Sequence, residues 1–323
     1  MENKSKFMLF FITLKVLVSL MYSINNSTFM KSLKKLLLPF LCSFSVLIYA
    51  QNSNEITIET IKLSDNVYML IGQGGNIGVS VGEDGVFIID DQYAHMSSKI
   101  EAAIKKLSDK PFQFLVNTHW HGDHTGGNEN MNTLGATIIA HDNVRKRLEE
   151  TPNRDTSMRP KEALPIITFN DKLNIHINGE QIIIFHVDNA HTDGDALLYF
   201  TESNVLHTGD VYFNGRFPYI DLNSGGSVNG YIKAVKQALM LIDDDTKIIP
   251  GHGKLSNKEE YAFFLNMLET IKKNVLAEIS NGKTEDEVAA NTSITKTYDD
   301  LGYSWNFISS EKTRRAFYKS LKE

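Results

Sequence analysis

The sequence predicts a single α/β domain with β-sheets inside and helices outside. Short apolar runs of strand length fill much of the chain, helical patterns lie between and after them, and no linker or low-complexity tract interrupts residues 51–323. The composition, 42% hydrophobic and 22% charged over 323 residues, is that of a globular protein long enough to bury a large core. Collagen-like, coiled-coil and wholly disordered chains are excluded by the same composition.

The first 50 residues are expected to be a targeting segment outside this domain. Apolar runs at 7–22 and 36–49 flank a basic stretch, and the second run ends at Ala50. From Met30 onward this order is typical of a secretory signal peptide cleaved after Ala50, with residues 1–29 an over-extended start. We therefore expect export to the periplasm or the extracellular space. A membrane anchor is the alternative, but both runs are shorter than the roughly 20 residues of a spanning helix, so no permanent anchor is expected.

The rest of the chain is acidic and has no cysteine. Of the 33 basic and 39 acidic residues, six Lys and one Glu lie in residues 1–50, so residues 51–323 carry a net charge of −11. Such a chain lacks the basic face that binds a phosphate backbone, so nucleic acid is not an expected partner. Because the one cysteine, Cys42, lies in the targeting segment, the domain holds no disulfide and no multi-cysteine metal site.

Apolar alternation and turn signals place the elements in order. Strands are expected at 56–61, 67–71, 76–81, 86–89, 112–117, 136–140, 166–169, 172–177, 181–187, 196–200, 205–208 and 247–249. Helices are expected at 96–107, 142–150 and 228–242, and residues 256–323 are expected to be mainly helical. Residues 151–165 are polar, contain three Pro and are expected to form a loop.

The run from His119 to His124 places four metal-ligand side chains within six residues: His119, His121, Asp123 and His124. It follows the strand expected at 112–117, and alternate residues of an extended segment point the same way. His119 and His121 can therefore face one ion while the other two side chains turn toward a second. Imidazole and carboxylate together suit zinc or a similar first-row metal.

Three more residues of ligand type follow apolar strands in Gly-rich loops: His191, Asp210 and His252. Functional side chains are commonly placed on loops at strand ends. Each residue alone has a plainer explanation as a turn or packing residue, as Asp195 does. All seven together predict a metal site.

These motifs, with Asp90 or Asp91 after the strand at 86–89, resemble those of the metallo-β-lactamase superfamily over most of residues 56–255. The resemblance implies a four-layer αββα sandwich with two zinc ions per chain at one edge of two facing sheets, where other divalent metals also fit. It implies the following roles: His119, His121 and His191 bind the first zinc, Asp123, His124 and His252 bind the second, Asp210 bridges them, and Asp90 or Asp91 orients a ligand histidine.

The resemblance also implies an enzyme, a zinc-dependent hydrolase, which the expected signal peptide would export. A metal-bound hydroxide would attack the carbonyl of an ester, lactone, thioester or amide, a β-lactam included, and Asp123 would receive a proton. The best-known antibiotic-hydrolysing subclass has a cysteine where this chain has Asp210, which favours members such as hydroxyacylglutathione hydrolases and lactonases. Two alternatives stay open: a mononuclear-iron persulfide dioxygenase of the same fold, and a binding protein without catalysis.

The expected substrate is a small molecule that carries an anionic group, because two zinc ions outweigh their carboxylate and hydroxide ligands. Tyr212, Phe213 and Arg216 follow Asp210 closely and are the candidate substrate contacts. The aromatic side chains would line an apolar pocket and Arg216 would pair with the anion. A packing loop with a solvated Arg explains the same residues equally well.

Overall fold

The computed structural model describes residues 56–152 and 157–322, and Ile56–Glu323 form one compact unit. The expected signal peptide, residues 1–50, lies outside the described residues. Within the described part of the chain, no helix is both long and apolar enough to cross a membrane.

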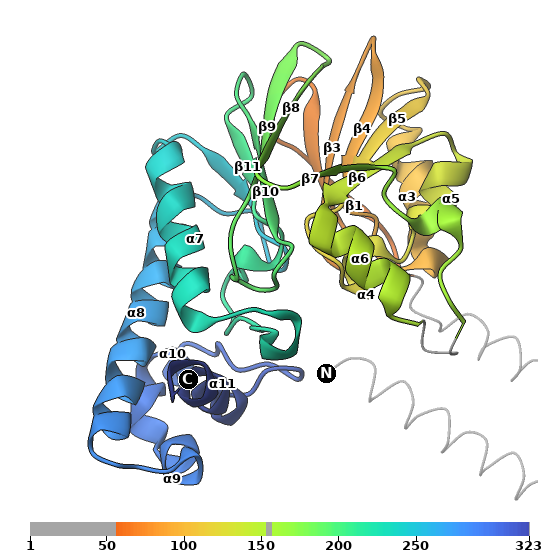
Figure 1. The fold of residues 1–323 in the computed structure, drawn as a ribbon. Coiled ribbons are helices and arrows are strands. Elements are labelled where there is room, and N and C mark those ends of the chain that lie inside the picture. The colour runs from red at the N-terminus through yellow and green to blue at the C-terminus, as the bar shows by residue number, and fades with distance from the viewer. Residues whose placement is uncertain (1–55, 153–156, 323) are drawn as a thin grey trace, which may run out of the picture. The chain divides into compact units, whose positions relative to one another are not determined.

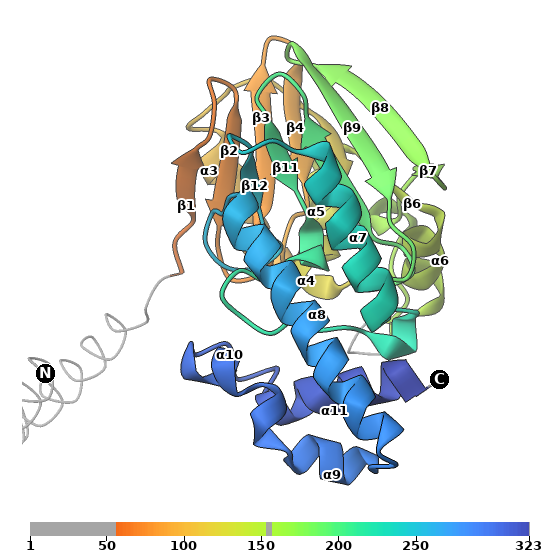
Figure 2. The ribbon, with the colours of Figure 1, turned by 90° about the vertical axis from the view of Figure 1, so that its left-hand side faces the viewer.

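A seven-stranded sheet forms one half of the centre of this unit (Figures 1 and 2). Its strands, whose order in space is their order in the chain, are β1 (Glu59–Lys62), β2 (Val67–Ile71), β3 (Ile77–Gly82), β4 (Gly85–Ile89), β5 (Phe112–Val116), β6 (Thr137–His141) and β7 (Ile167–Phe169). Strands β1 to β4 pair antiparallel, and β4 to β7 pair parallel.

A five-stranded sheet faces it, with the order β12-β11-β10-β9-β8. Its strands are β8 (Lys172–Ile177), β9 (Glu180–His186), β10 (Ala196–Phe200), β11 (Val205–His207) and β12 (Lys247–Ile249). All neighbours are antiparallel except β11 and β12, which are parallel.

Helices α3 and α5 pack on the outer face of the seven-stranded sheet, and α7 and α8 pack on that of the five-stranded sheet (Figure 1). The helices of the described residues are α3 (Ser97–Ile104), α4 (Gly122–Thr125), α5 (Asn128–Thr133), α6 (Asp142–Glu150), α7 (Val228–Leu241), α8 (Lys258–Ser280), α9 (Glu285–Ala290), α10 (Lys296–Asp300) and α11 (Ser310–Lys322). Short 3-10 turns, η1 to η5, lie at Ala94–Met96, Lys161–Ala163, Gly209–Val211, Leu222–Ser224 and Thr292–Ile294.

Three clusters of buried apolar side chains join the helices and sheets: one lies between the two sheets, and one lies between each sheet and its helices. In β4, Val86 and Ile88 pack toward α3, while Phe87 and Ile89 pack between the sheets, because successive strand residues point to opposite faces. Phe87 meets Phe200 of the other sheet edge to face, with ring centroids 6.0 Å apart. The third cluster joins the five-stranded sheet to α7, α8 and α11. This αββα arrangement confirms the predicted fold class.

Most predicted elements have nearly the observed bounds, and those of β2, β8, β10, β12 and α6 agree residue for residue. The first strand begins later than expected, at Glu59. Helix α3 ends at Ile104 and continues as a turn rather than as helix to residue 107. The prediction missed α5, where only Asn128 and Met131 are buried, so no apolar stripe marks the helix.

Candidate metal centre

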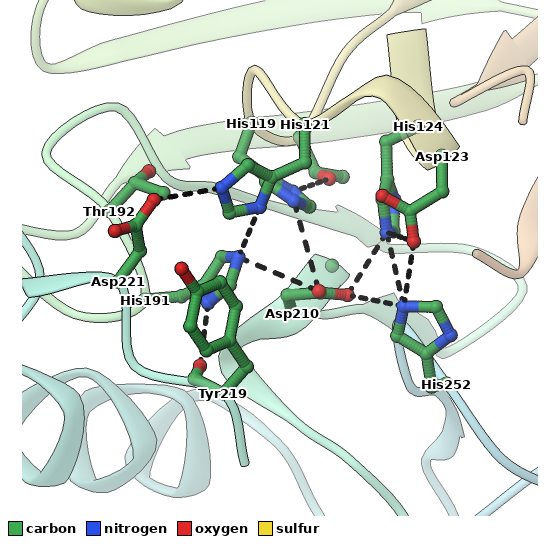
Figure 3. A network of polar contacts seen from close by, with 12 residues as sticks. His119, His121, Asp123, His124, His191, Thr192, Asp210, Tyr219, Asp221 and His252 are labelled. Atoms are coloured by element: carbon green, nitrogen blue, oxygen red, sulfur yellow. Dashed lines mark hydrogen bonds and ion pairs between the residues drawn. The ribbon is translucent and has the colours of Figure 1, made fainter. Parts of the chain in front are cut away.

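The seven candidate ligands meet at one edge of the two sheets, each in or near a loop that follows a strand. His119 and His121 follow β5, and the one-turn helix α4 carries the next two ligands. His191 follows β9, Asp210 lies in η3 after β11, and the last ligand follows β12. Figure 3 shows their side chains pointing toward a common centre. Strand ends from both sheets therefore supply the site, as the sequence motifs indicated.

The ligand atoms form two compact sets, each within 4.8 Å, that are consistent with a binuclear metal site. The first ligand group is His119, His121, His191 and Asp210, and the second ligand group is Asp123, His124 and His252. Sequence spacing alone had already suggested that His119 and His121 face one ion and Asp123 and His124 another.

Asp210 lies between the two groups and turns one oxygen toward each. Its Oδ2 lies 3.5 Å from Nε2 of His191 and 3.8 Å from Nε2 of His119. Its Oδ1 lies 3.1 Å from Nε2 of His124 and 3.4 Å from Nε2 of His252. One carboxylate thus bridges the centre, with an oxygen available to an ion on either side.

The hydrogen bonds of the first ligand group leave two nitrogen lone pairs facing each other. His191 donates from Nδ1 to the carbonyl oxygen of Tyr219 at 2.7 Å, and His121 donates from Nε2 to Asp221 at 3.0 Å. A neutral imidazole that donates from one nitrogen has its lone pair on the other. The two remaining nitrogens, Nε2 of His191 and Nδ1 of His121, are 2.9 Å apart. A cation bound by both satisfies this arrangement.

Hydrogen bonds from Nδ1 also orient the rings of His119 and His124, so that Nε2 of each ring faces the centre. Nδ1 of His124 donates to Asp90 at 2.7 Å. The hydroxyl of Thr118 donates to Asp90 at 2.8 Å and so accepts from Nδ1 of His119 at 3.1 Å. Nε2 of His119 and Oδ1 of Asp210 are buried with no hydrogen-bond partner among the described residues. Buried polar atoms without partners are costly, so these donors fit a metal ion.

Asp90, not Asp91, orients a ligand histidine. Asp90 accepts from His124 and also from the backbone N–H of Thr118, at 2.7 and 2.8 Å. Asp91 accepts from the backbone N–H of Gly127 at 2.8 Å, and its second oxygen has no hydrogen-bond partner among the described residues. Its burial raises its pKa well above the usual value. The sequence left both residues open because they are adjacent and both follow β4.

Asp221, which holds His121, was missed by the sequence analysis. It also accepts from the hydroxyl of Ser224 at 2.6 Å, and the resulting network lies beside the first ligand group (Figure 3). Asp221 lies 100 positions from His121, and nothing in its local sequence separates it from an ordinary helix cap. Asp195 has the plainer role considered above, since it accepts from the backbone and hydroxyl of Thr192 and closes the loop that carries His191.

The two ligand groups differ in proton affinity. Burial lowers the pKa of His191 to about 4 and that of His119 well below the usual value. Burial also acts to lower the pKa of His252, but the charge of Asp210 and a hydrogen bond that His252 donates to Asp123 outweigh burial and raise this pKa to about 9. His124 likewise has a raised pKa, because nearby carboxylates overcome the effect of burial.

Two glycines let backbone approach the ligands closely. A Cβ at Gly75 would lie 2.1 Å from a ring carbon of His124, and a Cβ at Gly251 would lie 2.1 Å from Oδ1 of Asp210. Neither distance is possible for a real side chain, so any other residue would displace the ligand. The backbone is therefore shaped around these two side chains.

The three candidate substrate contacts have different surroundings. Tyr212 does not face the centre: it is 1% exposed, packs against Tyr261 and Phe264, and belongs to the core under α8. That expectation was wrong, because the 3-10 turn η3 directs this side chain inward. Phe213 stacks on His252, with ring centroids 5.1 Å apart. Arg216 is exposed, and its guanidinium carbon lies 5.3 Å from the ring centre of Trp305.

The sequence analysis also missed Tyr219, which contacts two ligands of the first group. Its ring centroid lies 5.8 Å from that of His121 and 5.7 Å from that of His191. It is half-buried, so part of the ring is open to solvent. Its position three residues after Arg216, in a loop with Phe217, was the available signal.

A large surface hollow of about 860 Å³ lies elsewhere, at the β8–β9 turn and the loop between β1 and β2. Its buried carboxylate, Glu180, accepts from the backbone N–H groups of Glu202 and Ser203. The lining contains no histidine, and its polar groups are bonded to one another. The metal centre is therefore the better candidate for chemistry.

The chain has an α/β fold with two mixed sheets and an intact His/Asp metal site at one edge. These features are those of a metallohydrolase. A family model described as "Metallo-beta-lactamase superfamily" matches residues 70–252, more than half of the chain. The chain belongs to the metallo-β-lactamase superfamily, and the resemblance noted from its motifs is confirmed.

Relatives within the superfamily have different activities. The chain is 29% identical over 161 residues to a hydroxyacylglutathione hydrolase of Pelagibacter ubique, a match covering 48% of this chain and 58% of that protein. It is 24% identical over 232 residues to a type 2 metallo-β-lactamase of Bacteroides fragilis, covering 67% and 88%. The solved metallo-β-lactamase of Pontibacter korlensis shares the fold, with a TM-score of 0.57, 17% identity, and coverage of 66% of this chain and 99% of that one.

Proposed function

We propose that this metallohydrolase is an exported enzyme that uses two divalent metal ions, with zinc as the first candidate, to hydrolyse an ester, lactone, thioester or amide. The observation that carries the proposal is the position of Asp210, which has one oxygen toward each ligand group. The names of the relatives support carbonyl chemistry, since a thioester and a β-lactam amide are both acyl compounds. The substrate is proposed to be a small molecule with an anionic group.

Two ions held by these residues would supply a water of lowered pKa as nucleophile and a Lewis acid for the carbonyl oxygen. The residues around them fix the donors before substrate arrives. Asp90, Asp221 and the carbonyl oxygen of Tyr219 each accept a proton from a ligand histidine and so direct its other nitrogen inward.

Asp123 is the proposed catalytic residue. Its side chain is 26% exposed, against 5% for Asp210, so a substrate reaches it more readily. Burial acts to raise its pKa, but the charge of His124 and a hydrogen bond from His252 lower it to about 2. Asp123 is therefore a carboxylate at neutral pH, which is the form that binds a metal ion. Its greater exposure is the feature that supports the proposed role as proton acceptor during turnover.

Among acyl substrates, the chain favours esters, lactones and thioesters over β-lactams, because Asp210 stands where the best-known antibiotic-hydrolysing subclass has cysteine. A mononuclear-iron dioxygenase would need only one ligand group. The second ligand group, whose donors lie within 4.8 Å of one another, would then have no role. This arrangement supports hydrolysis with two metals.

The test is a metal analysis and a substrate panel on the same purified sample. We expect about two metal ions per chain and turnover of at least one ester, lactone or thioester. His121→Ala should remove turnover and reduce bound metal, whereas His95→Ala, which changes an exposed histidine bonded to Gln73, is the control. One iron per chain with oxygen uptake on a persulfide, or a metal-loaded protein that cleaves no acyl compound, would contradict the proposal. Cell fractionation tests export separately.

A further inference from the structure

Four aromatic side chains form a continuous arc that joins the two ligand groups. We call Phe213, Trp305, Phe307 and Tyr219 the aromatic arc. Phe213 stacks on a ligand of the second group and lies 6.0 Å from Trp305. Trp305 lies 5.7 Å from Phe307, and Phe307 lies 5.2 Å from Tyr219, centroid to centroid. Tyr219 in turn contacts two ligands of the first group, so the arc begins and ends at the metal centre.

Two members of the arc come from a segment far along the chain, residues 303–308, which we call the C-terminal strap. It connects α10 to α11 and lies outside residues 70–252, the part matched by the family model. Three hydrogen bonds fix it: Phe217 N–H donates to Tyr303 O at 3.0 Å, Trp305 Nε1 donates to Phe217 O at 2.9 Å, and Trp305 N–H donates to Ile308 O at 3.0 Å. The strap is thus held against the loop that carries Tyr219.

The arc leaves apolar surface open to solvent. Phe307 is 52% exposed, and Trp305 and Tyr219 are only half-buried. Exposed aromatic surface next to a polar site is the usual lining of a small-molecule pocket. A substrate whose flat apolar group packs against these rings would remove their exposed surface from water. The carbonyl carbon of the same substrate would then lie at the metal centre.

Two cationic side chains lie over rings of the aromatic arc and have no carboxylate partner among the described residues. The guanidinium of Arg216 lies 5.3 Å from the ring centre of Trp305, and the ammonium of Lys312 lies 5.6 Å from that of Phe307. The Lys312 ammonium also donates to the carbonyl oxygen of Phe307 at 2.8 Å, and within residues 56–152 and 157–322 neither cation forms an ion pair with a carboxylate. On a strongly acidic chain, two such cations beside one apolar wall favour a ligand that carries a negative charge.

We propose that the C-terminal strap is the specificity wall of the enzyme, and that it selects an acyl substrate whose non-reacting part is a flat apolar group with a carboxylate. The inference rests on the proposed hydrolysis at the metal centre. Trp305 and Phe307 contact the apolar group, and Arg216 and Lys312 attract the carboxylate.

The first experiment compares two esters with the same leaving group, 4-nitrophenyl phenylacetate and 4-nitrophenyl acetate. The wild-type chain should prefer the phenylacetyl ester, and Phe307→Ala should reduce this preference in kcat/KM by roughly 3- to 10-fold, mainly through KM. Phe307→Leu, which keeps apolar surface, should recover part of it. Met240→Ala is the control, since Met240 is an 82% exposed apolar residue of α7 and belongs to neither the strap nor the arc.

The carboxylate is tested with the phenylacetyl ester that carries a para-carboxylate. Arg216→Gln combined with Lys312→Gln should reduce the preference for the charged ester over the uncharged one, and raising the salt concentration should have the same effect. If the double variant keeps the full preference for the charged ester, the carboxylate part of the proposal is wrong.

A binding measurement separates this inference from the proposed function. By calorimetry on the metal-loaded full chain, phenylacetate should bind ~10-fold tighter than acetate, and Phe307→Ala should remove the difference. Tighter binding of phenylacetate without hydrolysis of any ester would support the wall and contradict the proposed function. Hydrolysis without preference for phenylacetyl, or equal binding of the two carboxylates, would overturn the wall.

Discussion

The two ligand groups share Asp210 and the same residue types, yet they hold protons very differently. Burial lowers the pKa of His191 to about 4, whereas the pKa of His252 is raised to about 9. Removal from water acts to lower the pKa of both rings. Their neighbours differ: on His191 the charge of Asp210 is opposed by neighbouring imidazoles, whereas on His252 two carboxylates, Asp210 and Asp123, act together and outweigh the loss of water. The balance of carboxylates and imidazoles around each ring therefore sets its proton affinity.

Removing the shared ligand tests whether the two groups act as one site. Asp210→Ala should lower kcat/KM by on the order of 10³-fold or more, because both ions lose a ligand and the charge stabilisation of the transition state is worth several kcal/mol. Metal analysis should show fewer than two ions per chain. Asp188→Asn, at an exposed carboxylate paired with Lys233, is the control. A variant that retains both ions and normal turnover would show that Asp210 does not bridge.

Acidification should separate the two groups. A metal at the second group must displace protons at neutral pH, since His252 has a pKa of about 9, whereas His191, with a pKa of about 4, is already neutral. Each displaced proton changes metal affinity about tenfold per pH unit, so roughly 100-fold is expected between pH 8 and pH 6. Equilibrium dialysis against a chelator should show loss from two ions to one before the second is lost. Simultaneous loss of both ions would contradict the predicted difference in proton affinity between the two ligand groups.

The same pKa values predict how the metal-free protein responds to pH. His252 has a raised pKa in the folded state, so its contribution to the free energy of unfolding is present below about pH 6.5 and is lost as the pH rises through about 9. His191 has a lowered pKa, so its contribution is lost as the pH falls from about 6.5 toward 4. Urea unfolding of the chelated protein at a series of pH values measures both contributions. His252→Gln should reduce the loss on the alkaline side, and the part due to His124, whose pKa is also raised, should remain.

The carboxylates that orient the histidines should affect the two groups unequally. Asp90→Asn should weaken metal binding most at the second group, through His124, and less at the first, which it reaches through Thr118 and His119. Asp221→Asn should weaken binding at the first group, and each main effect should be about 10- to 100-fold. Asp91→Asn is a control next to Asp90, because the Asp91 side chain bonds only Gly127 N–H among the described residues. Competition with a coloured chelator resolves the two affinities. Equal effects of Asp90→Asn and Asp91→Asn would refute the assignment of Asp90.

The smallest effect is expected at Ser224, which touches the first group only through Asp221. Its hydroxyl donates to Asp221 at 2.6 Å. A hydrogen bond of this kind contributes about 1 kcal/mol, so Ser224→Ala should weaken metal binding at the first group ~5-fold. The second group should be unaffected. If Ser224→Ala instead weakened metal binding at the second group, the hydrogen-bond network of Asp221 would have to orient ligands of both groups.

Sequence reasoning found the ligands and one orienting carboxylate, as Asp90 or Asp91, but it missed Asp221. The ligands stand in local motifs after apolar strands, such as the run from His119 to His124. Asp221 has no such motif, and only the hydrogen bond to His121, 100 positions away, reveals its role. Tyr212 was misplaced because an aromatic residue near a ligand can equally belong to the core, and the η3 turn decides which.

The sequence by itself determined the fold class and the chemical types of the seven ligands. Strand periodicity and ligand spacing are properties of the local sequence, so they can be recognised without knowing how distant segments meet. Only the tertiary structure decided which oxygen of Asp210 faces which group, that Asp90 rather than Asp91 orients His124, and that the C-terminal strap lies beside the centre. These features depend on contacts between segments far apart in the chain, where distance and orientation, rather than residue type, set hydrogen bonding and charge.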